Sequence, residues 1–151
     1  MKFRVETQGF AEMEKALEEF RPATARNVLR RAGLGALEPV AEGMRAKAPK
    51  RLENLRDAID TGTKRQKGVK KTFPDSSTVE VYAGVSVVGG GVPPQAYQQE
   101  FGNEHHGPQP YARPTWDREE RPTLDRVKES LGAEIDKASQ RAKRKALKAK
   151  R

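Results

Sequence analysis

The sequence of 151 residues is 34% apolar and 34% charged, and is therefore less apolar than an ordinary globular domain at roughly 45–50%. Part of the chain is expected to stay solvated or to bury its surface only against partners. The net charge of +9 is uneven, since 137–151 holds eight basic residues, 61–74 holds five, and neither segment has an acidic one. The rest of the chain is mildly acidic, which indicates an acidic partner for the two basic segments, either DNA or a neighbouring subunit.

The absence of cysteine excludes disulfides and thiolate chemistry. No apolar run approaches the roughly 18 residues that a membrane-spanning helix needs, and the first ten residues contain no signal-peptide core. We therefore expect a soluble protein made in a cytoplasm, with no membrane partner.

The N-terminal region is expected to begin with a strand. Residues 2–8 alternate apolar and polar side chains, which is the period of a half-buried strand. Apolar residues then recur every three or four positions from Phe10 to Phe20, as in an amphipathic helix. We expect Pro22 to close this helix and Thr24 to cap the next one.

The second predicted helix is long and runs to about Lys47. Pro39 lies inside it and cannot donate to the carbonyl four residues back, which predicts a kink or break near Leu37. Apolar residues from Leu52 to Ile59 predict a further helical turn or two.

The centre of the chain has the pattern of β structure. Residues 78–88 alternate, and their apolar face is expected to carry Val79, Val81, Ala83, Val85 and Val87. Segment 62–73 is the candidate partner, joined through a turn at 74–77, and its charge predicts an exposed hairpin arm. Glycines and prolines in 89–94 predict a flexible loop.

The C-terminal part is expected to be one long helix that starts at Pro122, a residue suited to a first helical turn. Its apolar stripe shrinks to alanine where the basic run begins at Lys137, so the segment from 137 is expected to overhang and to be dispensable for folding. The predicted fold class is α+β: an N-terminal strand and helices packed on a small antiparallel sheet with a hairpin arm, followed by a long C-terminal helix. We divide it into a domain at 1–121 and a helix at 122–151.

Residues 96–117 hold four of the nine aromatic residues and three prolines. Prolines restrict their own backbone and keep the preceding residue extended, so we expect a stiff, non-helical stretch suited to docking. The predicted interface residues are Tyr97, Glu100, Phe101, Pro110, Tyr111, Arg113, Pro114 and Trp116.

The same stretch carries a resemblance. Its residues are Tyr97, Glu100, Phe101 and Gly102, followed by Pro108, Pro110, Tyr111, Arg113 and Pro114, with an upstream echo in Ala48, Pro49, Leu55 and Ile59. In these positions the chain resembles the tail-completion, or head-to-tail joining, family of long-tailed bacteriophages, over roughly Gly9 to Asp117. Glu53 and Asn54 stand where the family has Thr-Gly, and Tyr111 stands where Phe is commoner. The resemblance implies a structural protein of the phage neck that assembles into a ring.

Catalytic and metal chemistry find little support in the sequence. His105 and His106 have Glu100 and Glu104 nearby, but adjacent histidines seldom face one ion and no third ligand is well spaced. The serines lack a nucleophile motif, and the glycines at 89–91 lack the phosphate-loop pattern. We therefore expect no catalytic, cofactor-binding or metal-binding residues, and no enzyme activity.

Two functions remain as hypotheses. The first, implied by the resemblance, is a virion protein of the phage neck, a homo-oligomeric ring (a hexamer favoured over a dodecamer) that contacts neighbouring neck, tail-tube or connector proteins and surrounds the DNA. The alternative is a non-specific nucleic-acid-binding protein that uses the basic C-terminal helix. In both, the predicted contacts to DNA or an acidic partner are Lys64, Arg65, Lys67, Lys70, Lys71, Arg141, Lys143, Arg144, Lys145 and Lys148.

Overall fold

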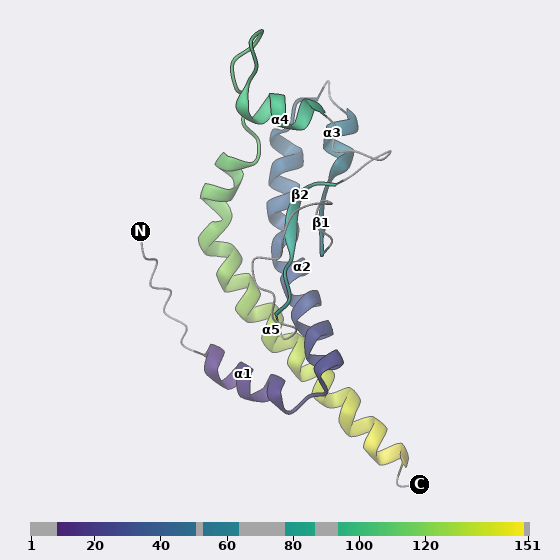
Figure 1. The fold of residues 1–151 in the computed structure, drawn as a ribbon. Helices are drawn as coiled ribbons and strands as arrows, with labels where there is room; N and C mark the ends of the chain where they lie inside the picture. The colour runs from purple at the N-terminus through teal and green to yellow at the C-terminus, as the bar shows by residue number, and fades with distance from the viewer. Residues whose placement is uncertain (1–8, 51–52, 64–77, 87–93, 150–151) are drawn as a thin grey trace.

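A computed structural model describes residues 9–50, 53–63, 78–86 and 94–149, and it is an α+β fold (Figure 1). Its elements in chain order are α1 (Phe10–Glu18), α2 (Pro22–Lys47), α3 (Glu53–Ala58), β1 (Ile59–Gly62), β2 (Tyr82–Val85), α4 (Pro94–Phe101) and α5 (Arg113–Ala149). The expected fold class is confirmed in its helices, its small antiparallel sheet and its long C-terminal helix. The expected N-terminal strand and most of the hairpin arm lie outside the described residues.

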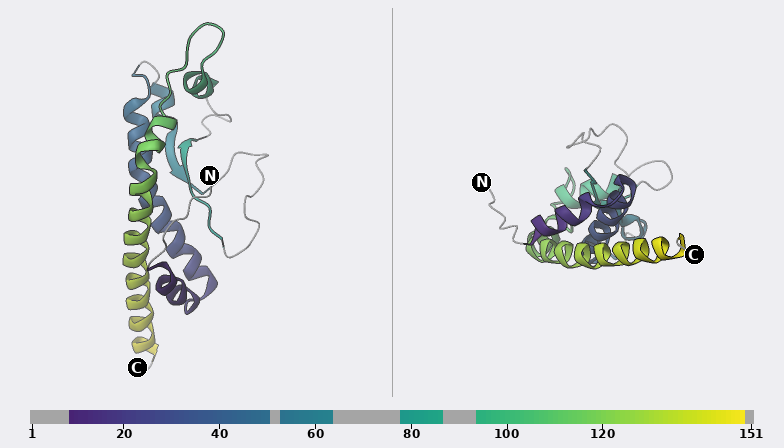
Figure 2. Two further views of the ribbon diagram at one scale, coloured as in Figure 1. Left: turned by 90° about the vertical axis from the view of Figure 1, so that its left-hand side faces the viewer. Right: turned by 90° about the horizontal axis from the view of Figure 1, so that it is seen from below.

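Helices α2 and α5 form the long axis of the molecule and run antiparallel to each other (Figures 1 and 2). The Nε atom of Arg126 donates a hydrogen bond to the carbonyl oxygen of Ala36 at 3.2 Å. Further along the pair, Arg31 forms an ion pair with Glu134. The later residue of α5 thus contacts the earlier residue of α2, as antiparallel helices require. These two contacts fix the register of the two helices.

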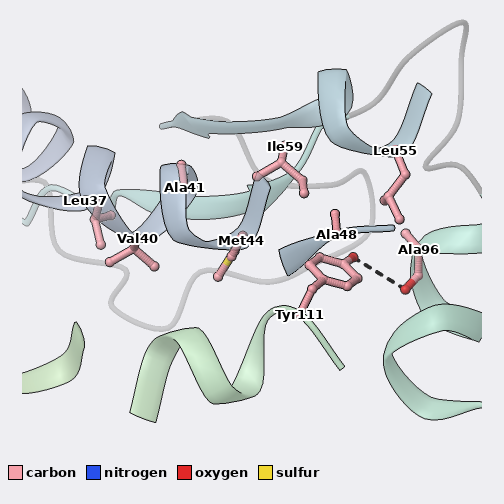
Figure 3. Packing of buried hydrophobic residues seen from close by; sticks show 9 residues of the cluster. All are labelled: Leu37, Val40, Ala41, Met44, Ala48, Leu55, Ile59, Ala96 and Tyr111. Carbon is pink, nitrogen blue, oxygen red and sulfur yellow. Dashed lines mark hydrogen bonds between the residues drawn. The ribbon is translucent and has the colours of Figure 1, made fainter. Parts of the chain in front are cut away.

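The described part of the chain forms two hydrophobic clusters along this axis. The α4-end core is shown in Figure 3 and consists of Leu37, Val40, Ala41, Met44, Ala48, Leu55, Ile59, Ala96 and Tyr111. The α1-end core consists of the buried residues Val28, Ala32, Leu131, Ile135 and Ala138, with α1 packed on it. Leu131, Ile135 and Ala138, the α5 residues of the α1-end core, lie in the middle turns of that helix.

Within the described residues the sheet has two antiparallel strands, with Ile59 opposite Val85 and Gly62 opposite Tyr82. The apolar face predicted for 78–88 is confirmed at Val81, Ala83 and Val85, which pack against the α4-end core. The strand itself is shorter than expected. Ile59 is the first residue of β1, so the prediction that it continues a helix was wrong; its β-branched side chain suits a strand.

Two helix boundaries also differ from the expectations. Helix α1 ends at Glu18, and Pro22 opens α2 at the first helical position, where its missing N–H is not needed. Thr24 therefore lies inside α2 and is not its cap. Helix α2 continues unbroken through Pro39.

Helix α5 begins at Arg113, nine residues before the expected start at Pro122. Pro114 occupies its first turn, and Pro122 is an exposed interior residue. The domain boundary expected between 121 and 122 thus falls inside a helix. Helix α5 is one element that packs on both α2 and α1.

Candidate interaction site

The connection between α4 and α5, residues 102–112, protrudes at one end of the molecule (Figure 1). Its first residue is Gly102, whose N–H donates to the carbonyl oxygen of Gln98 at 2.7 Å. Gly102 has a φ of +80°, and a Cβ on it would lie 2.9 Å from the nitrogen of Pro108. Glycine is required here on both counts, because side chains disfavour this backbone conformation and the chain returns too close.

The carboxylate of Glu100 holds the start of α5. One carboxylate oxygen accepts hydrogen bonds from the backbone N–H groups of Tyr111 and Ala112 at 2.8 and 2.9 Å. The other accepts from the backbone N–H and the Nε of Arg113, each at 3.0 Å. A buried acid thus satisfies N–H groups at a helix start, where no carbonyl of the preceding turn is available and where the helix dipole favours a negative charge.

Hydrogen bonding keeps the Glu100 carboxylate ionised. Burial of this carboxyl is the largest single influence and raises its pKa. The backbone N–H groups of Ala112, Arg113 and Tyr111, together with the Arg113 side chain, outweigh burial and hold the pKa below its usual value of 4.5. Burial and the neighbouring Glu100 charge raise the pKa of Tyr111 to about 12.

The connecting loop is braced by its own polar groups. The backbone N–H of Gln109 donates to the carbonyl oxygen of Gln99 at 2.8 Å, and the side-chain amides of the two residues are hydrogen-bonded at 2.7 Å. The side-chain oxygen of Asn103 accepts from the backbone N–H groups of His105 and His106. The loop therefore has a fixed shape although most of its side chains are exposed.

The ring of His106 contacts the backbone of its own loop: Nδ1 of His106 lies 3.0 Å from the carbonyl oxygen of Gly107. Over the described part of the chain, no three His, Cys, Asp or Glu side chains are grouped as a metal site would require.

Three large aromatic side chains are exposed beside the loop. Tyr97 is 68% exposed, Phe101 52% and Trp116 42%. The rings of Tyr97 and Phe101 lie 4.7 Å apart, and the guanidinium carbon of Arg113 lies 4.8 Å above the Phe101 ring. Trp116 is three residues along α5 from Arg113, which places the two side chains side by side on the helix surface. We call Tyr97, Phe101, Arg113 and Trp116 the aromatic face.

Tyr111 does not belong to this face. Its ring is 4% exposed in the α4-end core, and its hydroxyl donates to the carbonyl oxygen of Ala96 at 3.4 Å (Figure 3). Its assignment to an interface is therefore corrected: the ring packs inside its own chain. Glu100 is likewise buried, so it supports the site without touching a partner, whereas Pro110 is exposed and Pro114 is partly buried in the first turn of α5.

The stretch 96–117 is also less extended than expected, because only 102–112 is non-helical. Tyr97 and Phe101 are four residues apart on α4, and this helical spacing brings their rings into contact. Gln99 and Gln109 were not among the predicted site residues, because no pattern in the sequence indicates that they pair.

The two basic segments have different outcomes. Lys64, Arg65, Lys67, Lys70 and Lys71 lie outside the described residues. Arg141, Lys143, Arg144, Lys145 and Lys148 are all exposed on the last turns of α5. Ala138, in contrast, is 6% exposed in the α1-end core, so the expectation that everything from Lys137 is dispensable for folding is corrected: the free segment begins after Gln140.

The chain was compared with protein-family models, with curated proteins and with solved structures, and no match was found in any of the three. Among the helices of the described residues, none is both long and apolar enough to cross a membrane.

Proposed function

We propose that this protein is a structural virion component of the head-to-tail joint of a long-tailed phage. It assembles into a ring, a hexamer favoured over a dodecamer, that completes the tail or connects it to the head and surrounds the DNA channel. The observation that carries the proposal is the aromatic face, which is exposed and is fixed in place by the residues that carry the family resemblance. Glu100, Gly102 and Arg113 form the support, and Tyr97 and Phe101 form the surface.

The composition of the aromatic face favours a protein partner. Aromatic and arginine side chains dominate the energetics of protein interfaces, and here they are presented on two helices joined by a braced loop. A surface that is already ordered loses little conformational entropy on binding. The face therefore suits a permanent contact with a neighbouring subunit or neck protein.

The test is to replace aromatic-face residues and measure the yield of infectious particles. Phe101→Ala and Trp116→Ala should each weaken the contact by about 2 kcal/mol or more and reduce particle assembly, with little loss of folding stability because both rings are exposed. Leu124→Ala is the matched control, since Leu124 is 41% exposed on α5 outside this face. Normal particle yield from both aromatic variants would refute the proposal.

A second candidate function rests on the exposed basic turns of α5. Non-specific nucleic-acid binding through Arg141–Lys148 would give an affinity for free DNA that falls with salt by a slope of about −0.9 for each phosphate neutralised. Binding to free DNA by a protein that never enters particles would favour this candidate over the neck protein. Recovery of the protein from purified virions would favour the neck protein.

A further inference from the structure

A groove lies on α1, α2 and α5 at the end of the molecule opposite α4. Its volume is about 780 Å³, and none of the nine described residues of α1 is buried. The apolar side chains of α1 and the start of α2 are only partly covered, so an apolar floor faces outward. We call this the α1 groove; its lining residues include Phe10, Met13, Leu17, Phe20, Leu29 and Leu131.

The polar groups of the α1 groove favour a protein segment over a small ligand. Glu14, Glu18 and Arg26 are the charged lining residues, and all three are exposed. Small-molecule sites usually contain polar groups that converge on a buried ligand and fix its orientation, whereas these three charged side chains are exposed to solvent. Glu12 adds a third exposed acid to α1, against one exposed base, Lys15. An apolar floor with acidic residues along α1 suits a basic helix that carries an apolar side chain.

The last turns of α5 have this chemistry. Every residue from Arg141 to Lys148 is exposed, and this tail segment holds five basic residues and no acidic one. Leu147 lies within it and is 68% exposed, as much as any large apolar side chain described. Ala142 and Ala146 present small side chains that allow another helix to approach closely.

The tail segment does not reach the groove of its own chain. Leu131 of α5 already lines that groove, and Leu147 is sixteen residues further along the same helix. At 1.5 Å per residue the separation along the axis is about 24 Å, and α5 continues away from α1 (Figure 2). The tail must therefore find its partner in another molecule.

We propose that the α1 groove binds the tail segment of a second copy of this chain, with Leu147 seated on the apolar floor and the basic residues beside Glu14 and Glu18. The inference deepens the proposed ring and rests on it. Because the groove of one copy meets the tail of the next, the contact is head-to-tail, and such contacts generate closed rings or open chains. Every copy supplies one tail and one groove.

Self-association of the purified chain, measured by sedimentation velocity, tests the proposal. Leu147→Asp in the tail and the double change Glu14→Lys with Glu18→Lys in the groove should each weaken association by about tenfold or more. Leu124→Asp is the control and should leave association unchanged, because Leu124 lies outside both surfaces. All of these positions are exposed, and circular dichroism melting confirms that each variant is folded.

Mixing the variants gives a sharper result. A tail variant and a groove variant retain one working surface each, so their mixture should form dimers and nothing larger. Adding Lys143→Glu and Arg144→Glu to the groove variant should restore association by exchanging the charges. If the tail segment contacted only DNA, neither the dimers nor the restored association would be expected.

Three outcomes would overturn the inference. The first is a wild-type chain that stays monomeric at about 1 mM, and the second is self-association that Leu147→Asp leaves unchanged. The third is a reversal of the tail charges that abolishes DNA binding and leaves self-association intact. None of these outcomes bears on the aromatic face, whose particle-yield test decides the proposed function separately.

Discussion

At the residue scale, Glu100 is the group on which the α4–α5 junction depends. Its carboxylate accepts four hydrogen bonds, and an amide has a single oxygen to offer. Glu100→Gln should therefore leave buried donors unpaired and lower the free energy of unfolding at pH 7 by about 2–4 kcal/mol. Glu104→Gln removes the same charge from an exposed loop position and should change the free energy of unfolding by less than about 0.5 kcal/mol.

The lowered pKa of Glu100 predicts a pH dependence. Because the pKa is lower in the folded chain than its usual 4.5, the stabilisation is fully present above that value and is lost as the pH falls through the folded-state pKa. The difference in free energy of unfolding between the wild type and Glu100→Gln should thus shrink below pH 4.5. Urea unfolding at pH 7 and at lower pH measures it, and an equal difference at both would contradict this account of the clamp.

Gly102 offers a second test of the junction. Gly102→Ala places a Cβ at positive φ and against Pro108, which should lower the free energy of unfolding by at least about 1–2 kcal/mol. Gly107→Ala lies in the same loop, where a Cβ would meet nothing within 4 Å. Thermal melting should show the loss only in the first variant, and equal melting of the two would contradict a requirement for glycine at 102.

At the element scale, α2 and α5 approach each other closely at Gly43. A Cβ there would lie 2.8 Å from the methyl carbon of Thr115. Thr115 is fully buried and its hydroxyl donates to the carbonyl oxygen of Tyr111 at 2.7 Å, so it has little freedom to move. Gly43→Ala should lower the free energy of unfolding by about 1–3 kcal/mol.

Gly35 is the matched position for this test. It lies in the same helix, where an added Cβ meets nothing within 4 Å, so Gly35→Ala should raise the free energy of unfolding by about 0.5–1 kcal/mol through helix propensity. Opposite signs for the two substitutions in urea unfolding would establish close approach as the reason for Gly43. A gain from both would show that the helices have room to separate.

The elements also show what the sequence can and cannot predict. Periodicity identified the apolar face of Val81, Ala83 and Val85, because alternation is a local property. It did not place the start of α5, since Pro114 and Pro122 both suit a first turn and only the buried Glu100 carboxylate, a long-range partner, selects between them. Tyr111 failed as an interface residue for the same reason: whether an aromatic ring lies in a core or on a surface depends on what packs over it.

At the scale of the whole molecule, the two ends differ in chemistry. The aromatic face lies at the α4 end, where the support is a network of hydrogen bonds around Glu100. The α1 groove and the tail segment lie toward the other end, where α5 continues beyond its own core (Figure 1). The two proposed contact surfaces therefore lie at different places along an elongated chain.

This division predicts how the chain tolerates truncation. Removing the residues after Gln140 deletes seven basic side chains and no acidic one, which lowers the net charge from +9 to +2. It removes no residue of either core. The free energy of unfolding should therefore change by less than about 0.5 kcal/mol, while self-association and particle yield should fall.

Truncation after Ser130 is the contrasting variant. It also removes Leu131, Ile135 and Ala138 from the α1-end core, and loss of a single large core side chain already costs about 2–5 kcal/mol. Because α1 and the start of α2 pack on these residues, urea unfolding should show this end of the molecule unfolded. The α4-end core should keep its contacts, because its last buried residue in the chain is Tyr111 and the truncation retains it. If truncation after Gln140 unfolded the chain as well, the last turns of α5 would be part of the core, and a free tail segment would be ruled out.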